Sequence, residues 1–246
     1  MDISLIWGEG LLNQIFKAVS VGPVAGVAIT IASVIVFCIV LPYLLGSVNL
    51  SIMISNRFYH DDIRLHGSGN AGMTNVMRTY GKKMAVLTFV GDFLKAVVAS
   101  VLGRLAFGLL GAFIAGMFCF IGHIFPIFYK FKGGKGVVTA CAMMFMTDLR
   151  VFGTLFIIFV LVVAVSKYIS LGSVVCILAY PLILDRYGLR GWPVLIGLLM
   201  AVLCTFAHRE NIKRIMKGTE NRFTFKVKHK KTVDEEKAEE SDGEES

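Results

Sequence analysis

Apolar runs of membrane-spanning length dominate this sequence of 246 residues. A helix that crosses a bilayer needs about 20 apolar residues, or about 17 at the short end. The apolar runs cover residues 22–45, 84–102, 106–128, 151–166, 169–184 and 192–207. With 56% hydrophobic and 17% charged residues, the chain is too apolar for an ordinary soluble domain. The sequence therefore predicts an all-α integral membrane protein.

The polar connections carry unequal charge, which predicts the orientation. Basic residues gather in segments 57–83 and 130–135 and after residue 207, and the positive-inside rule places these three segments in the cytoplasm. An even number of crossings must separate successive cytoplasmic segments, so the short run 137–146 must also cross. At about 1.5 Å per residue it falls short of a core about 30 Å thick, unless it tilts or the bilayer thins. We expect a bundle of about seven transmembrane helices, with the N-terminus outside and an outer turn at 147–150.

The two ends of the chain differ in composition from the apolar runs. The first ten residues contain Asp2 and Glu9 and no basic stretch, so we expect no cleaved signal peptide. Residues 234–246 contain eight acids and one lysine. We expect a membrane-embedded domain over 1–222 and a charged, disordered cytoplasmic tail over 223–246. Because the basic residues are split among short loops, anionic headgroups or phosphorylated substrates explain them better than nucleic acid does.

The first polar motif is HGSGNAGMTNVMR at 66–78. It shares letters with the dinucleotide-binding fingerprint, but an apolar run precedes it where that fingerprint needs a β-strand. Its glycines permit positive φ, and successive N–H groups in such a loop can bind an anion. The side chains that would add hydrogen bonds to a phosphate are Ser68, Asn70, Thr74, Asn75 and Arg78. The alternative is a plain turn between two helices, which would not need so many polar side chains.

The second polar motif is FKGGKGVVT at 131–139. It is not a Walker A loop, because Tyr129 stands where a glycine is required and Lys135 is followed by Gly136. Its glycines, Gly133, Gly134 and Gly136, surround a lysine and lead into a helix. Free N–H groups, a helix N-terminus and Lys135 in one place suit a phosphate group. For Lys130 and Lys132, which precede the glycines, the alternative is anchoring to lipid headgroups.

The third polar motif is HRENIKRIMKGTE at 208–220, and its pattern predicts an interfacial helix. His208, Asn211 and Ile212 share one face of such a helix. We expect His208 and Asn211 to face the last apolar run, where a role in a site and a structural role are both open. Glu220 is placed to pair with a basic loop residue. For the remaining basic residues, Arg209, Lys213 and Arg214, we expect anchoring to anionic lipid.

Several polar residues and the cysteines lie outside the three motifs. Asp92 and Lys95 are charged within an apolar run, so we expect them to face the bundle interior and pair at i, i+3. They form a structural tether or, alternatively, the floor of a site. For His123 we favour a structural hydrogen bond over catalysis. The five cysteines stand singly, without metal-ligand spacing, and read as small core residues: Cys38, Cys119, Cys141, Cys176 and Cys204.

Together and in this order, GSGNAGMTNVMR, GHIFPIFYKFKGGKGVVT and HRENIKRIMKGTE resemble the motifs of the bacterial acyl-phosphate:glycerol-3-phosphate acyltransferases, the PlsY family. The resemblance covers roughly residues 40–222. Departures are small: Met73 and Val138 stand where the family usually has Ala, and Ala96 where it has Gly. The stretch HKKTVD at 229–234 has the His-x4-Asp spacing of other glycerolipid acyltransferases, but it lies in the expected tail and we interpret it as chance.

The resemblance implies a reaction. An acyl phosphate donates its fatty acyl group to position 1 of glycerol 3-phosphate, giving lysophosphatidic acid and phosphate in the first committed acylation of phospholipid synthesis. It also implies a multi-pass enzyme of the bacterial plasma membrane whose active site faces the cytoplasm. Such an enzyme uses neither acyl-CoA nor acyl carrier protein directly and needs no metal or other cofactor. Its partners are the two substrates, membrane lipids and a soluble upstream enzyme that forms the acyl phosphate.

The resemblance also assigns roles to individual residues. The glycines of the second motif would hold the acyl phosphate, and Arg78, Lys135, His208 and Asn211 would hold glycerol 3-phosphate. Ser68 would take part in catalysis with these four. The supporting polar residues would be Asn70, Thr74, Asn75 and Glu220. For proton removal, two routes are open: the phosphate of the donor takes the hydroxyl proton, or His208 acts as general base.

Two other classes of protein are alternatives to the acyltransferase. A transporter of a phosphorylated solute would need a polar path across the bilayer and usually internal repeats, but the sequence shows no repeat and its polar motifs fall on one side. A scaffold that binds anionic lipid through basic loops would not explain the hydroxyl and amide side chains of the first motif. Both are weaker explanations of the sequence.

Overall fold

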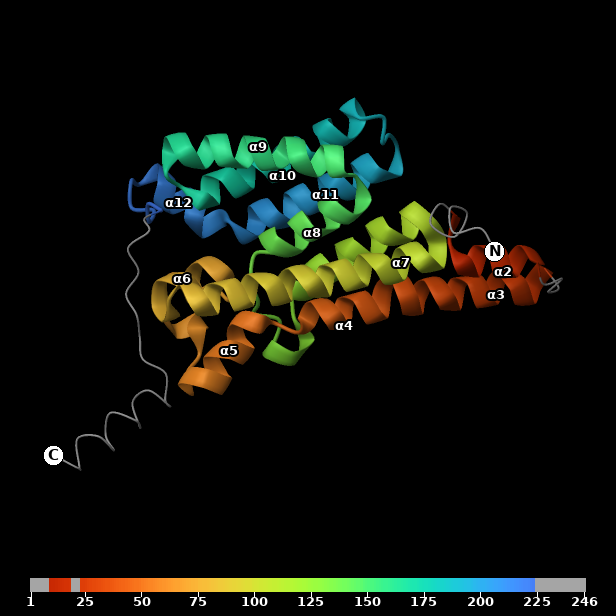
Figure 1. Cartoon of the computed structure of the whole chain (residues 1–246), viewed down its shortest axis with the longest axis horizontal. Helices are drawn as coiled ribbons and strands as arrows, with labels where there is room; N and C mark the ends of the chain where they lie inside the picture. The colour runs from red at the N-terminus through yellow and green to blue at the C-terminus, as the bar shows by residue number, and fades with distance from the viewer. Residues whose placement is uncertain (1–8, 19–22, 224–246) are drawn as a thin grey trace.

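The computed structural model describes residues 9–18 and 23–223, which are helical with no β-strand among them (Figure 1). The elements in chain order are α2 (Leu11–Ala18), α3 (Pro23–Val34), the π-helix η1 (Ile35–Val40), α4 (Leu41–Ser47), α5 (Leu50–Tyr59), η2 (Ile63–Leu65), α6 (Met73–Tyr80), α7 (Lys82–Ile124), η3 (Ile127–Tyr129), α8 (Val137–Thr147), α9 (Leu149–Ser166), α10 (Ile169–Arg186), α11 (Trp192–Ala207) and α12 (Arg209–Met216). The all-α prediction is confirmed for the described residues.

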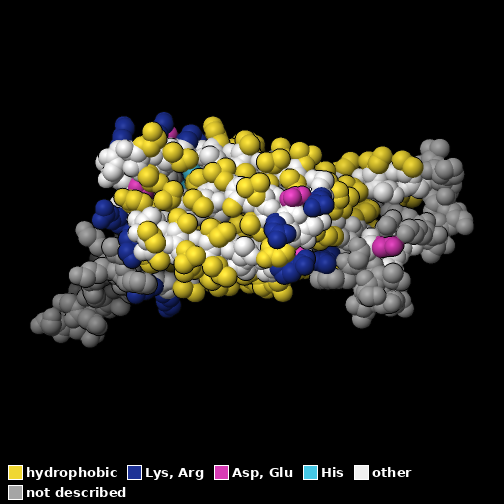
Figure 2. Space-filling model, turned by 90° about the horizontal axis from the view of Figure 1, so that it is seen from above, with side chains coloured by type: hydrophobic (Ala, Val, Ile, Leu, Met, Phe, Trp, Pro, Cys, Tyr) yellow, Lys and Arg dark blue, Asp and Glu magenta, His cyan; other side chains and the backbone are white. Residues whose placement is uncertain are grey.

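Among the described residues, four helical segments are long and apolar enough to cross a membrane: Ala25–Tyr59, Lys82–Tyr129, Leu149–Ser166 and Ile169–Arg186. A fifth would be α11 with α12, which are bent by 59° relative to each other. Apolar side chains cover the flank of the bundle in Figure 2, and most Lys and Arg side chains lie in two separate groups. Such an apolar outer surface suits lipid rather than water.

The longest helix, α7, contains two of the apolar runs expected from the sequence. Its backbone leaves helical geometry at Phe107 and at Gly108, which has a φ of 61°. The chain reverses there, so that the two arms of α7 pack against each other through Gly103 and Gly111. A Cβ atom on either glycine would clash with the carbonyl oxygen of the other. The runs 84–102 and 106–128 are therefore these two arms.

The short apolar run 137–146 forms α8, whose eleven residues extend about 16 Å at 1.5 Å per residue. It is an interior helix, and Ala142 and Met143 are fully buried. Asp148 alone separates α8 from α9. Its carboxylate accepts hydrogen bonds from the backbone N–H groups of Arg150 and Val151, at 2.8 and 3.4 Å, which caps the start of α9. The turn expected at 147–150 is present.

Lys95 joins both arms of α7 to the junction between α4 and α5. Its Nζ lies 2.6 Å from Asp92 Oδ1, and it donates to the carbonyl oxygens of Gly46 and Val48 at 3.0 and 2.5 Å. His123, on the second arm, places Nδ1 3.1 Å from the same Nζ. The structure thus supports the tether interpretation for Lys95 and the structural interpretation for His123. Asp92 and His123 also lie on the wall of the cavity described below.

The close contact between the two arms of α7 can be tested with Gly111→Ala. The added methyl group has no room beside Gly103, so we expect the free energy of unfolding to fall by about 1–3 kcal/mol. The measurement is the midpoint of thermal unfolding in detergent micelles. Gly153→Ala on α9 is the control, because no heavy atom lies within 4 Å of its added Cβ. Equal midpoints for the two variants would contradict the packing described.

Candidate functional site

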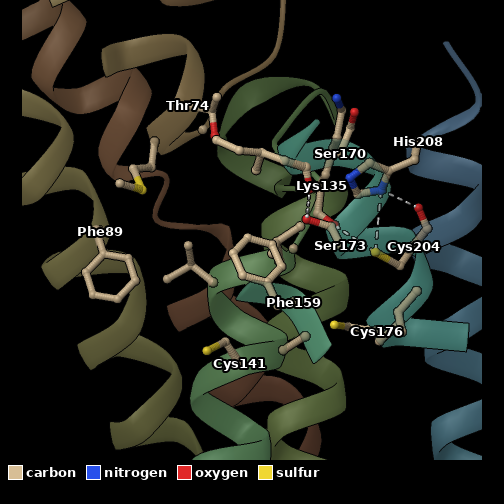
Figure 3. Close-up of a pocket in the computed structure, with 18 of the residues that line it drawn as sticks. Thr74, Phe89, Lys135, Cys141, Phe159, Ser170, Ser173, Cys176, Cys204 and His208 are labelled. Atoms are coloured by element: carbon tan, nitrogen blue, oxygen red, sulfur yellow. Dashed lines mark hydrogen bonds between the residues drawn. The ribbon is translucent and has the colours of Figure 1, made fainter. Parts of the chain in front are cut away.

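A cavity of about 680 Å³ lies where α6, α7, α8, α9 and α10 meet the junction of α11 and α12 (Figure 3). Its volume is within the range of small-molecule sites. Ten of the residues selected from the sequence line it: Ser68, Asn70, Thr74, Asn75, Arg78, Lys135, Gly136, His208, Asn211 and Glu220. The other two, Gly133 and Gly134, are not part of its wall. The fold therefore brings the three motifs together at one end of the cavity.

Asn75 organises the first motif from within. Its side chain is 1% exposed. Its Nδ2 donates to the carbonyl oxygens of Ile63, His66 and Asn70 at 3.1, 2.9 and 3.1 Å. Its Oδ1 accepts from the N–H of Ser68 at 3.0 Å. With its hydrogen-bonding capacity used inside the loop, Asn75 shapes the motif around the ligand space and presents the N-terminus of α6 to the cavity.

Gly133 and Gly134 have a packing role that differs from the expected anion cradle. Gly133 N–H donates to Ile124 O at 3.1 Å, and Gly134 N–H donates to His123 O at 3.0 Å. Neither N–H is left for a phosphate. A Cβ on either residue would clash with the segment around His123, so glycine is needed for this close approach. In this structure, therefore, neither glycine offers a free N–H to the three-glycine cradle expected from the sequence.

The anion-binding feature of the second motif is the N-terminus of α8. Gly136 adopts a φ of 76°, a left-handed conformation suited to glycine, and precedes the first turn of α8. Gly136, Val137 and Val138 line the cavity. The first N–H groups of a helix lack intrahelical partners and carry the positive end of its dipole. The N-termini of α6 and α8 therefore face the same space, and both favour negative charge.

Glu220 connects the third motif to α10 and to the second motif. Its Oε1 accepts from Ser170 Oγ at 2.8 Å and from Asn211 Nδ2 at 2.6 Å. Its Oε2 accepts from Arg214 Nε at 2.7 Å. Lys135 Nζ in turn donates to Asn211 Oδ1. Glu220 is only 8% exposed, and its basic partner is Arg214 on α12 rather than the loop residue expected from the sequence.

Arg214 belongs to this network, although the sequence pattern suggested that it anchors the helix to lipid. The guanidinium of Arg214 pairs with Glu220 and therefore points toward the polar end of the cavity. Arg209 and Lys213 remain on the surface, where Lys213 pairs with Glu210 at 3.2 Å. Of the three residues expected to anchor the helix to lipid, only Arg214 differs. The chain turns at Gly218, which brings Glu220 back over α12 to Arg214.

Positive charge is in excess at the polar end. Burial lowers the pKa of Lys135 to about 8; Arg214 and Arg78 lower it further, and Glu220 opposes them. Burial also lowers the pKa of Arg78, with Glu220 again opposing. Burial acts to raise the pKa of Glu220, but its hydrogen bonds from Arg214, Asn211 and Ser170 outweigh this effect and lower it. Three cations around one carboxylate leave unbalanced positive charge that an anionic ligand would neutralise.

His208 is buried at the end of α11 and has a defined orientation (Figure 3). Its Nδ1 lies 2.8 Å from Cys204 O. A carbonyl oxygen only accepts, so we assign the ring hydrogen to Nδ1 and leave Nε2 as an acceptor on the ligand side. Burial lowers the pKa of His208 to about 4, and Lys135 contributes to the lowering. The ring is therefore neutral at physiological pH.

The other end of the cavity is an apolar groove along α8. Val138, Cys141, Met144 and Phe145 line it from α8, and phenylalanines of α7 and α9 form its sides. The five cysteines are free thiols. Cys38 and Cys119 are core residues, as expected, and Cys204 is also buried. However, Cys141, Cys176 and Cys204 also border the cavity, a position that their scattered spacing in the sequence did not indicate.

Sequence reasoning missed several residues that shape the site. Ser170 and Ser173 bring hydroxyl groups from α10 to the polar end. In the sequence they are two serines near the start of the apolar run 169–184, a pattern that does not indicate a site. Arg64 joins the first two motifs by donating to the carbonyl oxygens of Tyr129 and Lys132, each at 3.2 Å. Asn49 joins α5 to the first motif by donating to Ala71 O at 3.3 Å. These contacts depend on tertiary structure.

Asn75→Asp tests whether this side chain shapes the first motif. The substitution replaces the Nδ2 donor by a carboxylate oxygen that would face three carbonyl oxygens. We expect a loss of about 1–3 kcal/mol in the free energy of unfolding, because three buried acceptors lose their donor. The measurement is thermal unfolding in detergent. Asn221→Asp, at the cavity wall, is the control; an equal loss in both variants would contradict a special role for Asn75.

Comparison with known proteins gives one family. The family model described as glycerol-3-phosphate acyltransferase matches residues 36–218. The glycerol-3-phosphate acyltransferase of Carboxydothermus hydrogenoformans is 41% identical over 188 residues, covering 76% of this chain and 96% of the relative. That of Finegoldia magna is 43% identical over 184 residues, covering 73% of this chain and 91% of the relative.

Solved structures agree with the sequence comparisons. The crystal structure of PlsY (YgiH), an integral membrane glycerol 3-phosphate acyltransferase, in its glycerol 3-phosphate form has a TM-score of 0.73 and 34% identity, covering 79% of this chain and 96% of that one. Its lysophosphatidic acid form gives a TM-score of 0.70 and 32% identity, covering 80% and 96%. The extent of these matches establishes that this chain is an integral membrane protein of the PlsY family of glycerol-3-phosphate acyltransferases.

Proposed function

We propose that this protein transfers a fatty acyl group from an acyl phosphate to position 1 of glycerol 3-phosphate, giving lysophosphatidic acid and inorganic phosphate. The observation that carries the proposal is the shape of one cavity: a polar end with excess positive charge leads directly into an apolar groove. The polar end suits two phosphate groups, and the groove suits a fatty chain. Solved relatives with glycerol 3-phosphate and lysophosphatidic acid support the acceptor and the product.

In this proposal the two phosphates occupy neighbouring parts of the polar end. The phosphate of the donor lies at the N-terminus of α8, where Gly136 leads into the helix. Glycerol 3-phosphate is held by Arg78 and Lys135 through its phosphate and by His208 and Asn211 through its hydroxyl groups. Ser68, Asn70 and Thr74 complete the wall on the side of α6. Asn75 and Glu220 act on the ligand indirectly by holding the first and third motifs in place.

Positioning and charge stabilisation account for most of the chemistry. The position-1 hydroxyl oxygen attacks the acyl carbonyl carbon, and the bond between that carbon and the phosphate oxygen breaks. The phosphate departs as a good leaving group, and Lys135 with the α8 N-terminus stabilises its charge. No protein nucleophile is needed, because the donor is already an activated mixed anhydride.

The donor's own phosphate is the better candidate for the proton acceptor. The phosphate of the donor gains negative charge as its bond to the acyl carbon breaks, so it becomes a stronger base as the reaction proceeds. The pKa of His208, about 4, makes its Nε2 a weak base near neutral pH. We therefore favour the substrate-assisted route, in which His208 accepts a hydrogen bond from glycerol 3-phosphate without removing its proton.

We also propose a topology, a location and a domain division. Counting the two arms of α7 separately and letting α8 cross as a short tilted segment, the chain crosses seven times with its N-terminus outside. The basic motif segments then lie in the cytoplasm of a bacterial plasma membrane. The membrane-embedded domain covers residues 1–222. Of the tail, 223–246, only Phe223 is described: it lies on the cavity wall, and its N–H donates to Lys167 O at 2.7 Å.

The proposed partners follow from this chemistry. They are the two substrates, the surrounding lipids and a soluble enzyme that supplies acyl phosphate from the cytoplasm. The basic segments contact headgroups and phosphorylated ligands, and nucleic acid has no part in the proposal. The stretch HKKTVD, interpreted from the sequence as a chance match, lies outside the described residues.

The charge of Lys135 predicts a pH dependence of kcat/KM for glycerol 3-phosphate. Its lowered pKa of about 8 means that the ammonium loses its proton as pH rises through that value, so kcat/KM should fall above about pH 8. Glu220 raises the pKa of Lys135, so Glu220→Gln should move this fall to lower pH. Glu210→Gln, on the exposed side of α12, is the matched control. A profile that is the same in all three proteins would contradict the assignment.

His208→Ala separates the two proton routes. If His208 only accepts a hydrogen bond, kcat/KM should fall by about tenfold. If it is the general base, the fall should reach about 10²–10⁴. We expect the smaller loss, measured as the initial rate of phosphate release. A loss of the larger size would overturn the substrate-assisted route, whereas a near-normal rate would remove His208 from the binding set as well.

The proposed reaction is tested with the purified full-length protein in detergent and EDTA, given palmitoyl phosphate and glycerol 3-phosphate. We expect phosphate release that needs both substrates and yields lysophosphatidic acid. Parallel reactions offer palmitoyl-CoA or omit glycerol 3-phosphate. Turnover with palmitoyl-CoA alone would show that the proposed donor is wrong. No turnover with either donor would contradict the acyltransferase.

A further inference from the structure

The apolar groove follows one face of α8 away from the polar end. The α8 residues on its wall are Val137, Val138, Ala140, Cys141, Met144 and Phe145. Apart from Val138 in the first turn, their spacing of i, i+3, i+4, i+7 and i+8 marks a single helix face. Phe145 is the last α8 residue on the wall. It lies eight residues after Val137, about 12 Å further along the helix axis. The groove thus has a defined start at the helix N-terminus and a defined direction.

Three phenylalanine rings from three helices meet at the far end of this groove. The ring of Phe145 lies 5.8 Å from that of Phe93 on α7 and 5.4 Å from that of Phe152 on α9, measured between centroids. The Phe93–Phe145 pair is tilted by 59°, and the Phe145–Phe152 pair, at 86°, is edge-to-face, a favourable arrangement. All three residues border the cavity. We call this cluster of Phe93, Phe145 and Phe152 the aromatic stop.

The aromatic stop is part of a longer row. Phe89 stacks on Phe93 with centroids 5.8 Å apart, and Phe156 stacks on Phe152 at 5.9 Å. The row runs from α7 across the end of α8 to α9, so the rings connect the two sides of the groove. Phe145 is 39% exposed, so one side of the row faces the bilayer, while a chain that follows α8 from the polar end meets the Phe145 ring.

We propose that the aromatic stop sets the length of the acyl chain that this protein accepts. The inference rests on the proposed function, because it needs an acyl phosphate whose head is at Lys135 and whose tail lies along α8. A chain that reaches Phe145 fills the groove. Additional methylene groups must displace packed rings or leave the groove sideways into the bilayer. One misfitting methylene group in a closed hydrophobic pocket changes kcat/KM by roughly 10–200-fold. Because this groove offers a sideways exit, we expect a total effect near the lower end of that range.

The test compares the chain-length profiles of variants of the full-length protein in one detergent, with octanoyl, lauroyl, palmitoyl and stearoyl phosphate as donors. Because Phe145 lies only about 12 Å beyond the start of α8, an extended lauroyl chain already reaches the stop. Phe145→Ala opens the stop, so the ratio of kcat/KM for palmitoyl over lauroyl phosphate should rise by about tenfold. Phe145→Leu should shift the ratio in the same direction by less. Cys141→Phe blocks the groove one turn earlier and should shift preference toward octanoyl phosphate.

Phe58→Ala is the matched control, because Phe58 lies on the surface of α5 away from the cavity. Its rate and profile should equal those of the unchanged protein. A single symmetric peak in size-exclusion chromatography shows that each variant is folded, and the three variants change the groove in two opposite directions. Agreement of the folded variants with these directions supports the proposal.

Two results would overturn the proposal and are distinguishable. If the unchanged protein uses acyl phosphates but the profile of every folded Phe145 and Cys141 variant matches that of Phe58→Ala, the chain leaves the groove before the stop, and the inference alone fails. If the unchanged protein uses no acyl phosphate of any length, the proposed donor fails, and the inference falls with it.

Discussion

The polar end of the cavity depends on one buried carboxylate. Glu220 gathers Ser170, Asn211 and Arg214, and through Asn211 it fixes Lys135. These groups come from three separate stretches of the chain. In a low-dielectric interior, a carboxylate with several charge-assisted donors holds its surroundings firmly, and leaving its cations unpaired would be costly. The same carboxylate keeps Lys135 partly charge-balanced while net positive charge remains for a ligand.

One short helix divides the cavity into a head and a tail. The N-terminus of α8 favours anions, and one side of the same helix is apolar from Val138 to Phe145. Because α8 is packed against α7, this division is rigid. The tether at Lys95 fixes the α4–α5 junction and both arms of α7 around it. An amphiphilic substrate is thereby oriented by one element, with its reactive bond at the boundary.

The sequence was informative where chemistry is local. A glycine-rich loop with a lysine predicted phosphate binding near Lys135, and helical periodicity predicted that His208 and Asn211 share a face; the cavity contains all three. The sequence also predicted that Glu220 pairs with a basic residue, although the residue is Arg214 on α12 and not one in a loop. Such inferences need only residue type and spacing within one segment.

The sequence was uninformative where a role depends on which atoms meet after folding. Gly133 and Gly134 looked like anion ligands, but their N–H groups bond to the segment around His123. The sequence predicted that Arg214 anchors α12 to lipid, but in the structure the turn at Gly218 places Glu220 beside it. Phe145 resembled any other apolar residue of a short run. Its position at the end of the groove depends on rings contributed by α7 and α9.

The most direct measurement is a crystal structure of the protein with glycerol 3-phosphate and a non-hydrolysable palmitoyl phosphonate. The account predicts the phosphonate at the N-terminus of α8 beside Lys135, the phosphate of glycerol 3-phosphate at Arg78, and the acyl chain along the face of α8 that ends at Phe145. A chain on another face of α8, or either anion bound away from these groups, would contradict the central claim that α8 separates head from tail.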